Sequence, residues 1–414
     1  MKRHKLTAAM LALICILSAS SLAGCSKTGQ APAQTELKSV ADHLYEISYT
    51  EDFNWGEDTV LATAGFACSG IQVGQYRGRN YDWYYDNTDI CVIHASATEN
   101  REHASVGVAD LSFLADGSGT YDLEKLPFYT VDGINDAGVC VQVNVMPMGE
   151  NGELTHTDSS LDDLPGEKVV RYLLDYADNV EEAISLLTAK DLYTIILDEE
   201  LHWMISGPAS ELDSTTKTVV AEFFPNGLHI TENFQEDIPV MTNFNVSNFD
   251  GTAKSVGWGC GYERWQILCE NYAQASSVMG TFDLMEKVFY SKMYDLYSDR
   301  FWYSEYALVD LCGYYEEAEL KSLLGEENYN YFVNNYGAVY YVPALWDGER
   351  SLAGNIDRAG IIAPVVRKVA DRYNAKSMGY ELWITVETSV YDLENLTLDL
   401  AVRESQDHYH FEIE

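Results

Sequence analysis

The chain has 414 residues, of which 47% are hydrophobic and 12% aromatic, so it carries enough apolar mass for a large core and is not an intrinsically disordered protein. Its 65 acidic and 26 basic residues give a formal net charge of −39. Nucleic-acid phosphates and anionic lipid headgroups repel such a charge, so we expect neither as an electrostatic partner. Eight cysteines are too few for a disulfide scaffold.

The N-terminus has the composition of a targeting signal. Three basic residues within the first five positions precede an apolar run over residues 6–22, which is short for a membrane-spanning helix. The tetrapeptide Leu-Ala-Gly-Cys at residues 22–25 resembles a bacterial lipobox. This resemblance implies a lipoprotein signal peptide over residues 1–24, lipidation of Cys25, and an extracytoplasmic protein held in the bacterial cell envelope by its lipid anchor. An uncleaved anchor helix and an ordinary signal with a chance cysteine are the alternatives.

The segment after the signal predicts a tether that leads into one large domain. Residues 25–36 are small and polar, which is typical of a flexible linker. We expect ordered structure from about Leu37. No internal repeat, low-complexity block or second linker interrupts the sequence from residue 37 to residue 414, so we interpret this stretch as one continuous domain.

The predicted elements alternate blocks of strands with blocks of helices. Two strands at residues 66–73 and 76–83 form a hairpin, and a third covers residues 139–145. Apolar residues recur at helical spacing over residues 165–187, with a new N-cap at Asn179. The remaining elements are predicted strands at residues 201–206, 218–224, 228–231, 240–244, 382–390 and 396–403, and helices at residues 262–275 and 282–296. The pattern favours an α+β fold with helical layers over two sheets.

Several motifs that identify common enzymes are absent from the sequence. It contains no Gly-x-Ser-x-Gly elbow, P-loop, dinucleotide-binding Gly-x-Gly-x-x-Gly or zinc-binding His-Glu-x-x-His. The one close histidine pair, His408 and His410, lies in an acidic tail that we interpret as solvated rather than metal-binding. We therefore expect no cofactor and no metal. Five other cysteines are interpreted as buried thiols without disulfides: Cys91, Cys140, Cys260, Cys269 and Cys312.

One cysteine carries more information than the others. Cys68 precedes Ser-Gly at a predicted strand, and Gly-Arg-Asn-Tyr-Asp-Trp follows at residues 78–83. The combination resembles the start of the choloylglycine hydrolase family of N-terminal-nucleophile (Ntn) hydrolases, which includes bile salt hydrolases and penicillin V acylases. The resemblance implies a four-layer αββα Ntn hydrolase fold and the hydrolysis of a linear amide. Similar segments continue in the family's order at residues 132–147, 201–205, 226–227, 241–243, 261–265 and 383–392.

The resemblance also implies the catalytic groups. Cleavage between Ala67 and Cys68 exposes an α-amine, whose pKa of about 7.7–8 lets it take and return a proton near neutrality. By resemblance, Arg79 stabilises the Cys68 thiolate and Asp82 orients the α-amine. Positions 79 and 82 face opposite sides of a regular strand, so the pairing requires a twist or bulge between them. The alternative is that Arg79 and Asp82 form a surface ion pair.

Three further residues join the site by the same resemblance. Asn144 supplies a donor to the oxyanion, Asn243 lies on the opposite side near the thiol, and Arg264 points into the site from the start of a helix. Asparagine is disfavoured in strands, so Asn144 and Asn243 each need a reason to be there. The alternatives are turn or strand-end asparagines and a solvent-facing arginine.

Cleavage before Cys68 divides the chain into a pro-segment over residues 37–67 and a catalytic domain over residues 68–414. The pro-segment is too apolar for a spacer, because it contains Trp55 and the run Leu-Tyr-Glu-Ile-Ser-Tyr at residues 44–49. We expect that it packs on the domain and remains there after cleavage. Residues 300–378 match no segment of the family; their many Tyr and Trp residues indicate either core and surface aromatics or a lid or acyl pocket.

The sequence therefore predicts a hydrolase that acts on a small linear amide through an acyl-thioester on Cys68. N-acyl amino acids, conjugated bile acids, phenoxyacetyl amides and acyl-homoserine lactones all remain open as substrates. A different class is a non-catalytic solute-binding lipoprotein, and a third is a retired hydrolase that keeps the fold but is not processed. Both alternatives predict an intact bond between Ala67 and Cys68.

Overall fold

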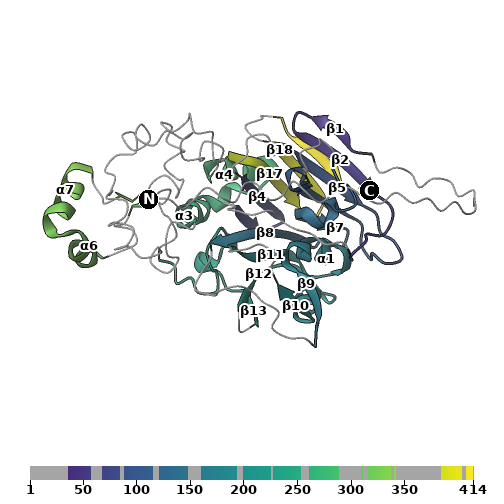
Figure 1. Cartoon of the computed structure of the whole chain (residues 1–414), viewed down its shortest axis with the longest axis horizontal. Helices are drawn as coiled ribbons and strands as arrows, with labels where there is room; N and C mark the ends of the chain where they lie inside the picture. Colours follow the sequence, from purple (N-terminus) through teal and green to yellow (C-terminus); the bar gives the residue numbers. More distant parts are fainter. Residues whose placement is uncertain are drawn as a thin grey trace, which may run out of the picture. The chain divides into compact units, whose positions relative to one another are not determined.

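Two β-sheets lie at the centre of the fold (Figure 1). The computed structural model describes residues 36–56, 68–83, 88–114, 121–147, 160–193, 199–224, 227–252, 261–288, 309–310, 316–336, 340–341, 384–402 and 407–413, all within the unit Thr35–Glu414. The predicted signal peptide and the lipidation site at Cys25 lie outside the described residues, as do Cys260, Cys312 and most of residues 300–378. No helix in the described part of the chain is both long enough and apolar enough to span a bilayer.

The larger sheet has nine strands in the order β1-β2-β5-β6-β7-β8-β11-β12-β13. Their bounds are Lys38–Ala41, Leu44–Tyr49, Ile90–Ala95, Ser105–Asp110, Thr130–Asn135, Cys140–Pro147, Glu199–Ser210, Asp213–Phe224 and Gly227–Thr231. All neighbours in it are antiparallel except β2 and β5, which are parallel. The first two strands lie within residues 37–67, and β2 pairs with β5, so the described part of this segment packs on the domain.

The smaller central sheet has six antiparallel strands in the order β14-β3-β4-β17-β18-β19. Their bounds are Val240–Met241, Ser69–Val73, Tyr76–Trp83, Ile384–Asp392, Thr397–Val402 and Tyr409–Glu412. The C-terminal residues that we interpreted as a solvated tail thus include an edge strand, in which His410 is half exposed and lies 3.0 Å from Asp399. Two further pairs of short strands belong to neither central sheet. They are β9 (Asp162–Pro165) with β10 (Lys190–Tyr193), and β15 (Val309–Asp310) with β16 (Tyr340–Tyr341).

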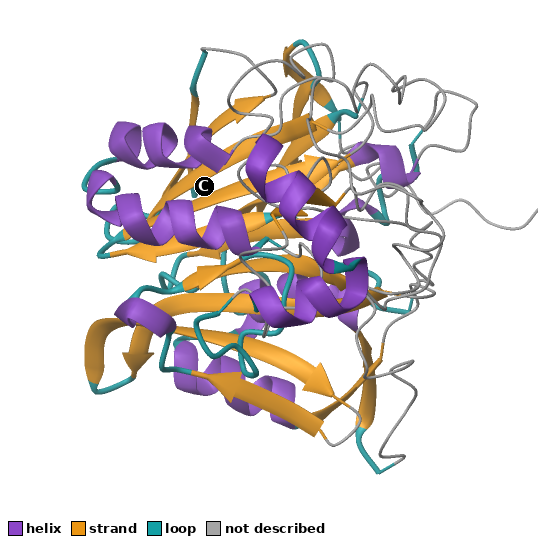
Figure 2. Cartoon of the chain, turned by 90° about the vertical axis from the view of Figure 1, so that its left-hand side faces the viewer, coloured by secondary structure: helices purple, strands orange, loops and turns teal. Residues whose placement is uncertain are grey.

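Helices cover the outer faces of both central sheets (Figures 1 and 2). On the nine-stranded sheet, α1 (Val169–Tyr176) contacts β7 and β8, and α2 (Val180–Thr188) contacts β11 and β12. On the six-stranded sheet, α3 (Tyr262–Asn271) contacts β3 and β14, and α4 (Val278–Met285) contacts β4 and β17. Because β18 contacts β6 and β7, the two sheets face each other. The layer order is αββα, as the sequence predicted, and two further helices are α6 (Glu317–Leu324) and α7 (Glu326–Tyr336).

Capping residues set the helix boundaries. The N-cap predicted at Asn179 is confirmed, because its side chain accepts a hydrogen bond from the Glu182 N–H at 3.0 Å and begins α2, while Ala177 is extended. The first helix begins at Val169 rather than at residue 165. The helix predicted from residue 282 begins at Val278, because Ser277 caps it. The strand predicted over residues 240–244 is only two residues long.

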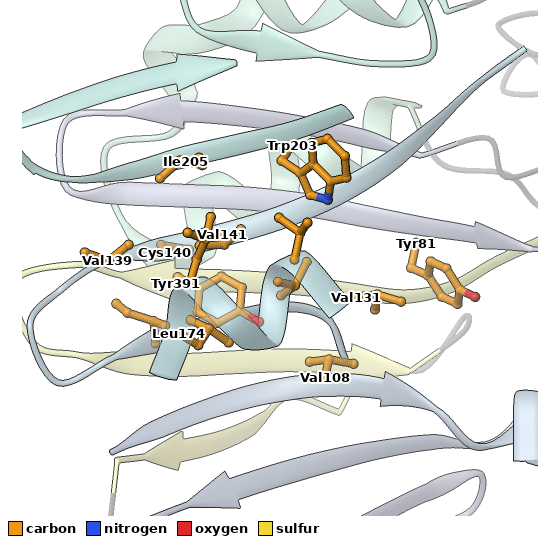
Figure 3. Packing of buried hydrophobic residues seen from close by; sticks show 14 of the residues in the cluster. Tyr81, Val108, Val131, Val139, Cys140, Val141, Leu174, Trp203, Ile205 and Tyr391 are labelled. Carbon is orange, nitrogen blue, oxygen red and sulfur yellow. The ribbon is translucent and has the colours of Figure 1, made fainter. Parts of the chain in front are cut away.

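The main hydrophobic cluster fills the space between the layers. In Figure 3, Tyr81 and Tyr391 of the six-stranded sheet lie with Val141 and Trp203 of the nine-stranded sheet and Leu174 of α1. Each is 1% exposed or less, and burial of a large apolar side chain contributes about 1.5–3 kcal/mol. Three of the five cysteines interpreted as buried thiols are described and are buried and free: Cys91, Cys140 and Cys269.

Gly133 of β7 lies in tight contact with β6 and α1. A Cβ added there would lie 2.6 Å from Leu174 Cδ1 and 2.9 Å from the Val106 carbonyl oxygen. We therefore expect Gly133→Ala to lower the free energy of unfolding by about 1–3 kcal/mol in urea titrations. The matched control is Gly56→Ala, because Gly56 is exposed and its added Cβ meets only the Asn54 side chain, at 3.5 Å. Equal losses in the two variants would contradict this packing.

Candidate active site

Cys68 lies directly before β3 and is 1% exposed. The side chain of Arg79, on the neighbouring strand β4, donates from Nη2 toward the Cys68 sulfur at 3.8 Å. Burial raises the pKa of the Cys68 thiol to about 11; the positive charge of Arg79 lowers this pKa, while Asp82 raises it. In the uncleaved chain the thiol is therefore protonated near neutral pH, and its ionisation requires a further favourable charge or a proton acceptor.

Arg79 joins the two central sheets. Its Nη1 donates to Asp132 Oδ2 of β7 at 2.6 Å, and its Nη2 donates to the Val143 carbonyl oxygen of β8 at 3.2 Å. Glu387 Oε2, on β17 of its own sheet, lies 3.6 Å from Nη1. Burial acts to lower the pKa of Arg79, but the negative charge of Asp132, the largest opposing cause, raises this pKa above its usual value. The guanidinium thus stays charged next to the sulfur.

Asp132 is the closest anionic partner of Arg79 and is fully buried. Besides Arg79, it accepts hydrogen bonds from Ser389 Oγ at 3.1 Å and from the Tyr391 hydroxyl, both on β17. These bonds fix the carboxylate and with it the guanidinium. The family resemblance in the sequence covers residues 132–147 but gives no role to Asp132.

Asp82 lies at an irregular position of the six-stranded sheet. Thr385 pairs with Asp82 and Glu387 with Tyr81, so β17 has one extra residue at this point. The extra residue thus lies on β17, whereas the sequence predicted an irregularity within β4, between residues 79 and 82. Thr385 Oγ1 donates to Asp82 Oδ1 at 2.6 Å. Both Arg79 and Asp82 are buried, so the alternative of a surface ion pair between them is wrong.

Arg264, in the first turn of α3, is 1% exposed, so the alternative of a solvent-facing charge is wrong. Its Nη1 donates to the Cys68 carbonyl oxygen at 2.6 Å and to Ser69 Oγ at 3.1 Å. Its Nη2 donates to Asn243 Oδ1 at 2.6 Å, and Asp82 Oδ2 lies 3.8 Å from Nη1. Arg264 therefore connects the main chain at Cys68 with two other residues expected in the site.

The two asparagines bond to main-chain carbonyls. Asn144, on β8, donates from Nδ2 to the Thr242 oxygen at 3.0 Å and to the Met241 oxygen at 3.4 Å. Asn243 donates from Nδ2 to the Val145 oxygen at 2.5 Å. These bonds explain why asparagine stands at both positions. An oxyanion role for Asn144 requires that its amide turn from these carbonyls toward a reacting carbonyl.

A row of three buried polar residues supports the segment that carries Asn243. Asn144 on β8 lies opposite His202 on β11, which lies opposite Glu222 on β12; we call them the polar row. His202 Nε2 donates to the Thr242 oxygen at 2.9 Å, because a carbonyl can only accept. Glu222 accepts from the main-chain N–H groups of residues 246 and 247 at 2.7 and 2.8 Å. The Thr242 carbonyl oxygen thus accepts hydrogen bonds from the side chains of Asn144 and His202. This explains why β14 ends at Met241.

The sequence comparison did not assign roles to His202, Glu222, Asp132 or Glu387. The sequence did offer one signal, a charged or polar residue inside an otherwise apolar strand. Examples are His202 in Leu-His-Trp at residues 201–203 and Glu222 in Ala-Glu-Phe at residues 221–223. Such a residue is costly to bury without a partner, so it indicates a structural or functional bond. Burial is the largest cause that raises the pKa of Glu387, to about 8, and the charge of Asp132 adds to it, whereas Arg79 lowers it.

An apolar pocket adjoins Arg79 and Asn144. Its walls come from η2 (Leu126–Tyr129), β7, β8 and β11. Most of its side chains are apolar, and Arg79, Asn144 and Glu167 are the charged and amide groups in its lining. The remaining lining residues are Tyr81, Phe113, Phe128, Tyr129, Thr130, Val131, Val143, Val145 and Leu201.

A model of the linear amide C–N hydrolases, choloylglycine hydrolase family, matches residues 68–286, which is more than half of the chain. The chain belongs to the choloylglycine hydrolase family. It is therefore an amidohydrolase that acts on linear amides, and a small amide is its expected kind of substrate. The family match begins at Cys68.

Solved structures with a similar chain path include two enzymes. A variant of the conjugated bile acid hydrolase from Clostridium perfringens is 15% identical, with a TM-score of 0.39, and the match covers 84% of this chain and 92% of that one. Penicillin V acylase from Agrobacterium tumefaciens is 14% identical, with a TM-score of 0.37, and the match covers 84% and 86%. A search of curated proteins found no match.

We expect His202→Leu to lower kcat about 10–100-fold with a smaller change in KM, because the Thr242 carbonyl loses a bond and the Asn243 segment moves. His202→Gln should restore most of kcat, since its amide can donate to the same oxygen. His410→Leu, at a half-exposed histidine, is the control and should leave kcat unchanged. Equal losses in the Leu and Gln variants of His202 would contradict the role of this hydrogen bond.

We expect Glu387→Gln to stabilise the fold, and increasingly so as the pH rises from about 4.5 to about 8. In this window the folded chain keeps a proton on Glu387 that the unfolded chain releases. The free energy of unfolding of the wild type therefore falls as the pH rises, by at most about 1.4 kcal/mol per pH unit. Glutamine removes this loss. Urea unfolding at pH 5 and pH 8 measures it, with the exposed Glu99→Gln as control. A pH-independent difference would show that Glu387 is ionised in the fold.

Proposed function

We propose that this chain is a cysteine Ntn hydrolase that cleaves a linear amide through an acyl-thioester on Cys68. The contact between Arg79 and the Cys68 sulfur carries the proposal, because it sets a permanent positive charge beside a nucleophilic atom. Arg264 supports it by holding the Cys68 carbonyl, and the family match supports it by beginning at this residue.

The proposed reaction starts with cleavage of the bond between Ala67 and Cys68. The new α-amine takes the thiol proton while Arg79 stabilises the thiolate, and the buried Asp82 orients the amine. Sulfur attacks the amide carbon, Asn144 donates to the resulting oxyanion, and the carbon–nitrogen bond breaks as the α-amine returns its proton to the leaving amine. Water then hydrolyses the thioester and regenerates the thiol.

The pocket beside Arg79 and Asn144 supports a substrate with an apolar acyl group. Its wall consists mainly of aromatic and aliphatic side chains, and Arg79 and Asn144 belong to the same lining. We propose that the acyl part binds against this apolar wall and that the pocket widens to admit it, because its cavity of about 30 Å³ is too small for an acyl chain.

The proposed enzyme acts outside the cytoplasmic membrane. The lipobox-like residues 22–25 and the basic, apolar N-terminus support a lipoprotein whose Cys25 carries the anchor. The high negative charge gives the rest of the chain no attraction of its own for an anionic bilayer, so a lipid is the expected means of attachment.

Intact-mass measurement and N-terminal sequencing test the proposal directly. We expect the long chain of the wild type to begin at Cys68, and Cys68→Ala to lower amide turnover at least about a thousandfold across a panel of N-acyl amides. Cys91→Ala, at a buried cysteine on another strand, is the matched control and should be cleaved and active. An uncut wild type that still hydrolyses amides would refute the mechanism; an uncut and inactive wild type would favour a binding protein or a retired hydrolase.

A further inference from the structure

Residues 36–56 precede the proposed cleavage site, yet they form part of the nine-stranded sheet. The strand β2 is not at the edge of the sheet, because β1 pairs with its other side. Six consecutive residues of β2, Leu44–Tyr49, pair with Ile90–Ala95 of β5 in one parallel ladder. The main chain extends this contact at both ends, where Ile90 N–H donates to the His43 oxygen and Ser96 N–H to the Tyr49 oxygen, each at 2.9 Å.

The side chains of β2 belong to the core on both faces of the sheet. Leu44 is fully buried in the main cluster between the layers. Ile47 and Tyr49 are 1% and 8% exposed and pack in a second cluster, with Cys91 and Ile93 of β5. The Tyr49 hydroxyl also donates to the Leu123 oxygen at 2.6 Å. Removal of β2 would therefore open the core in two places and leave β5 as an unpaired edge.

A second attachment lies after β2, at Trp55. Its ring contacts Phe128 of η2 with centroids 5.1 Å apart, and Tyr172 of α1 with centroids 5.9 Å apart. Lys168 Nζ donates to the Trp55 carbonyl oxygen at 3.0 Å. These contacts fix the segment 11 residues beyond the start of β2. Every contact described here is non-covalent and none depends on the bond before Cys68.

We propose that residues 36–56 remain bound after the chain is cut, so that the mature enzyme consists of two chains. The short chain, which ends at Ala67, supplies β1, β2 and Trp55; the long chain, which begins at Cys68, supplies the rest. This inference rests on one part of the proposed function, the cleavage of the chain before Cys68. It does not depend on the amide hydrolysis that follows. Where Cys25 is lipidated, the anchor belongs to the short chain, and the non-covalent contacts of β2 and Trp55 keep the catalytic chain at the membrane.

Native mass spectrometry of the wild type with a C-terminal tag tests retention. We expect the short and long chains to copurify at a ratio of one to one and to separate in guanidinium or SDS. A native mass equal to that of the long chain alone would overturn the proposal. An uncut wild type would refute the proposed processing instead, and retention is then tested on a full chain with a protease site placed within residues 57–67 and cut from outside. Loss of the short chain from that protein would equally overturn the proposal.

Variants in the two attachments show whether these contacts hold the short chain. We expect Ile47→Asp and Trp55→Ala each to speed its dissociation after the cut at least about tenfold, which pull-down through the tagged long chain measures over time. Glu51→Ala, at an exposed residue of the same segment, should leave the rate unchanged. If Ile47→Asp does not fold, the dissociation rate of the short chain is tested with Trp55→Ala alone. A cut Trp55→Ala protein that keeps its short chain as long as the wild type would contradict the second attachment.

Discussion

The charge of Arg79, buried between two sheets, is the constraint on which the site depends. An unpaired cation in such a place costs several kcal/mol, so the surrounding chain must provide anions and acceptors. Asp132 provides the nearest one, held in turn by Ser389 and Tyr391. This arrangement aims the guanidinium at the Cys68 sulfur and leaves it charged there. One buried charge thus links the packing of the two sheets to the ionisation of one thiol.

The two sheets contribute different parts of the site. The six-stranded sheet carries Cys68 and the irregularity beside Asp82, whereas the nine-stranded sheet carries the polar row. Arg264, in the helix that covers the six-stranded sheet, bonds to the Cys68 main chain and to Asn243, whose segment is held by His202 and the other members of the polar row. The site geometry therefore depends on how the layers stack, and a shift of either sheet would move donors away from the sulfur.

The sequence predicted the hairpin at Cys68, the two-sheet core and the cap at Asn179, because these depend on local patterns of apolar residues, turns and caps. It also selected six residues that lie together in the structure, through their likeness to a family. It did not indicate β5, β6 or β7, or the partners Asp132 and Glu387. Those carboxylates meet Arg79 only when distant strands pair, so no spacing in the sequence marks them among 65 acidic residues.

Acid quenching during turnover of an N-acyl amide, followed by mass spectrometry of proteolytic peptides, tests the central claim most directly. Our account predicts an added acyl group on the sulfur of residue 68, removable by hydroxylamine, and an adduct yield that falls when Arg79→Gln removes the charge beside that sulfur. An acyl adduct on any other residue, or an unchanged yield in the Arg79 variant, would contradict it.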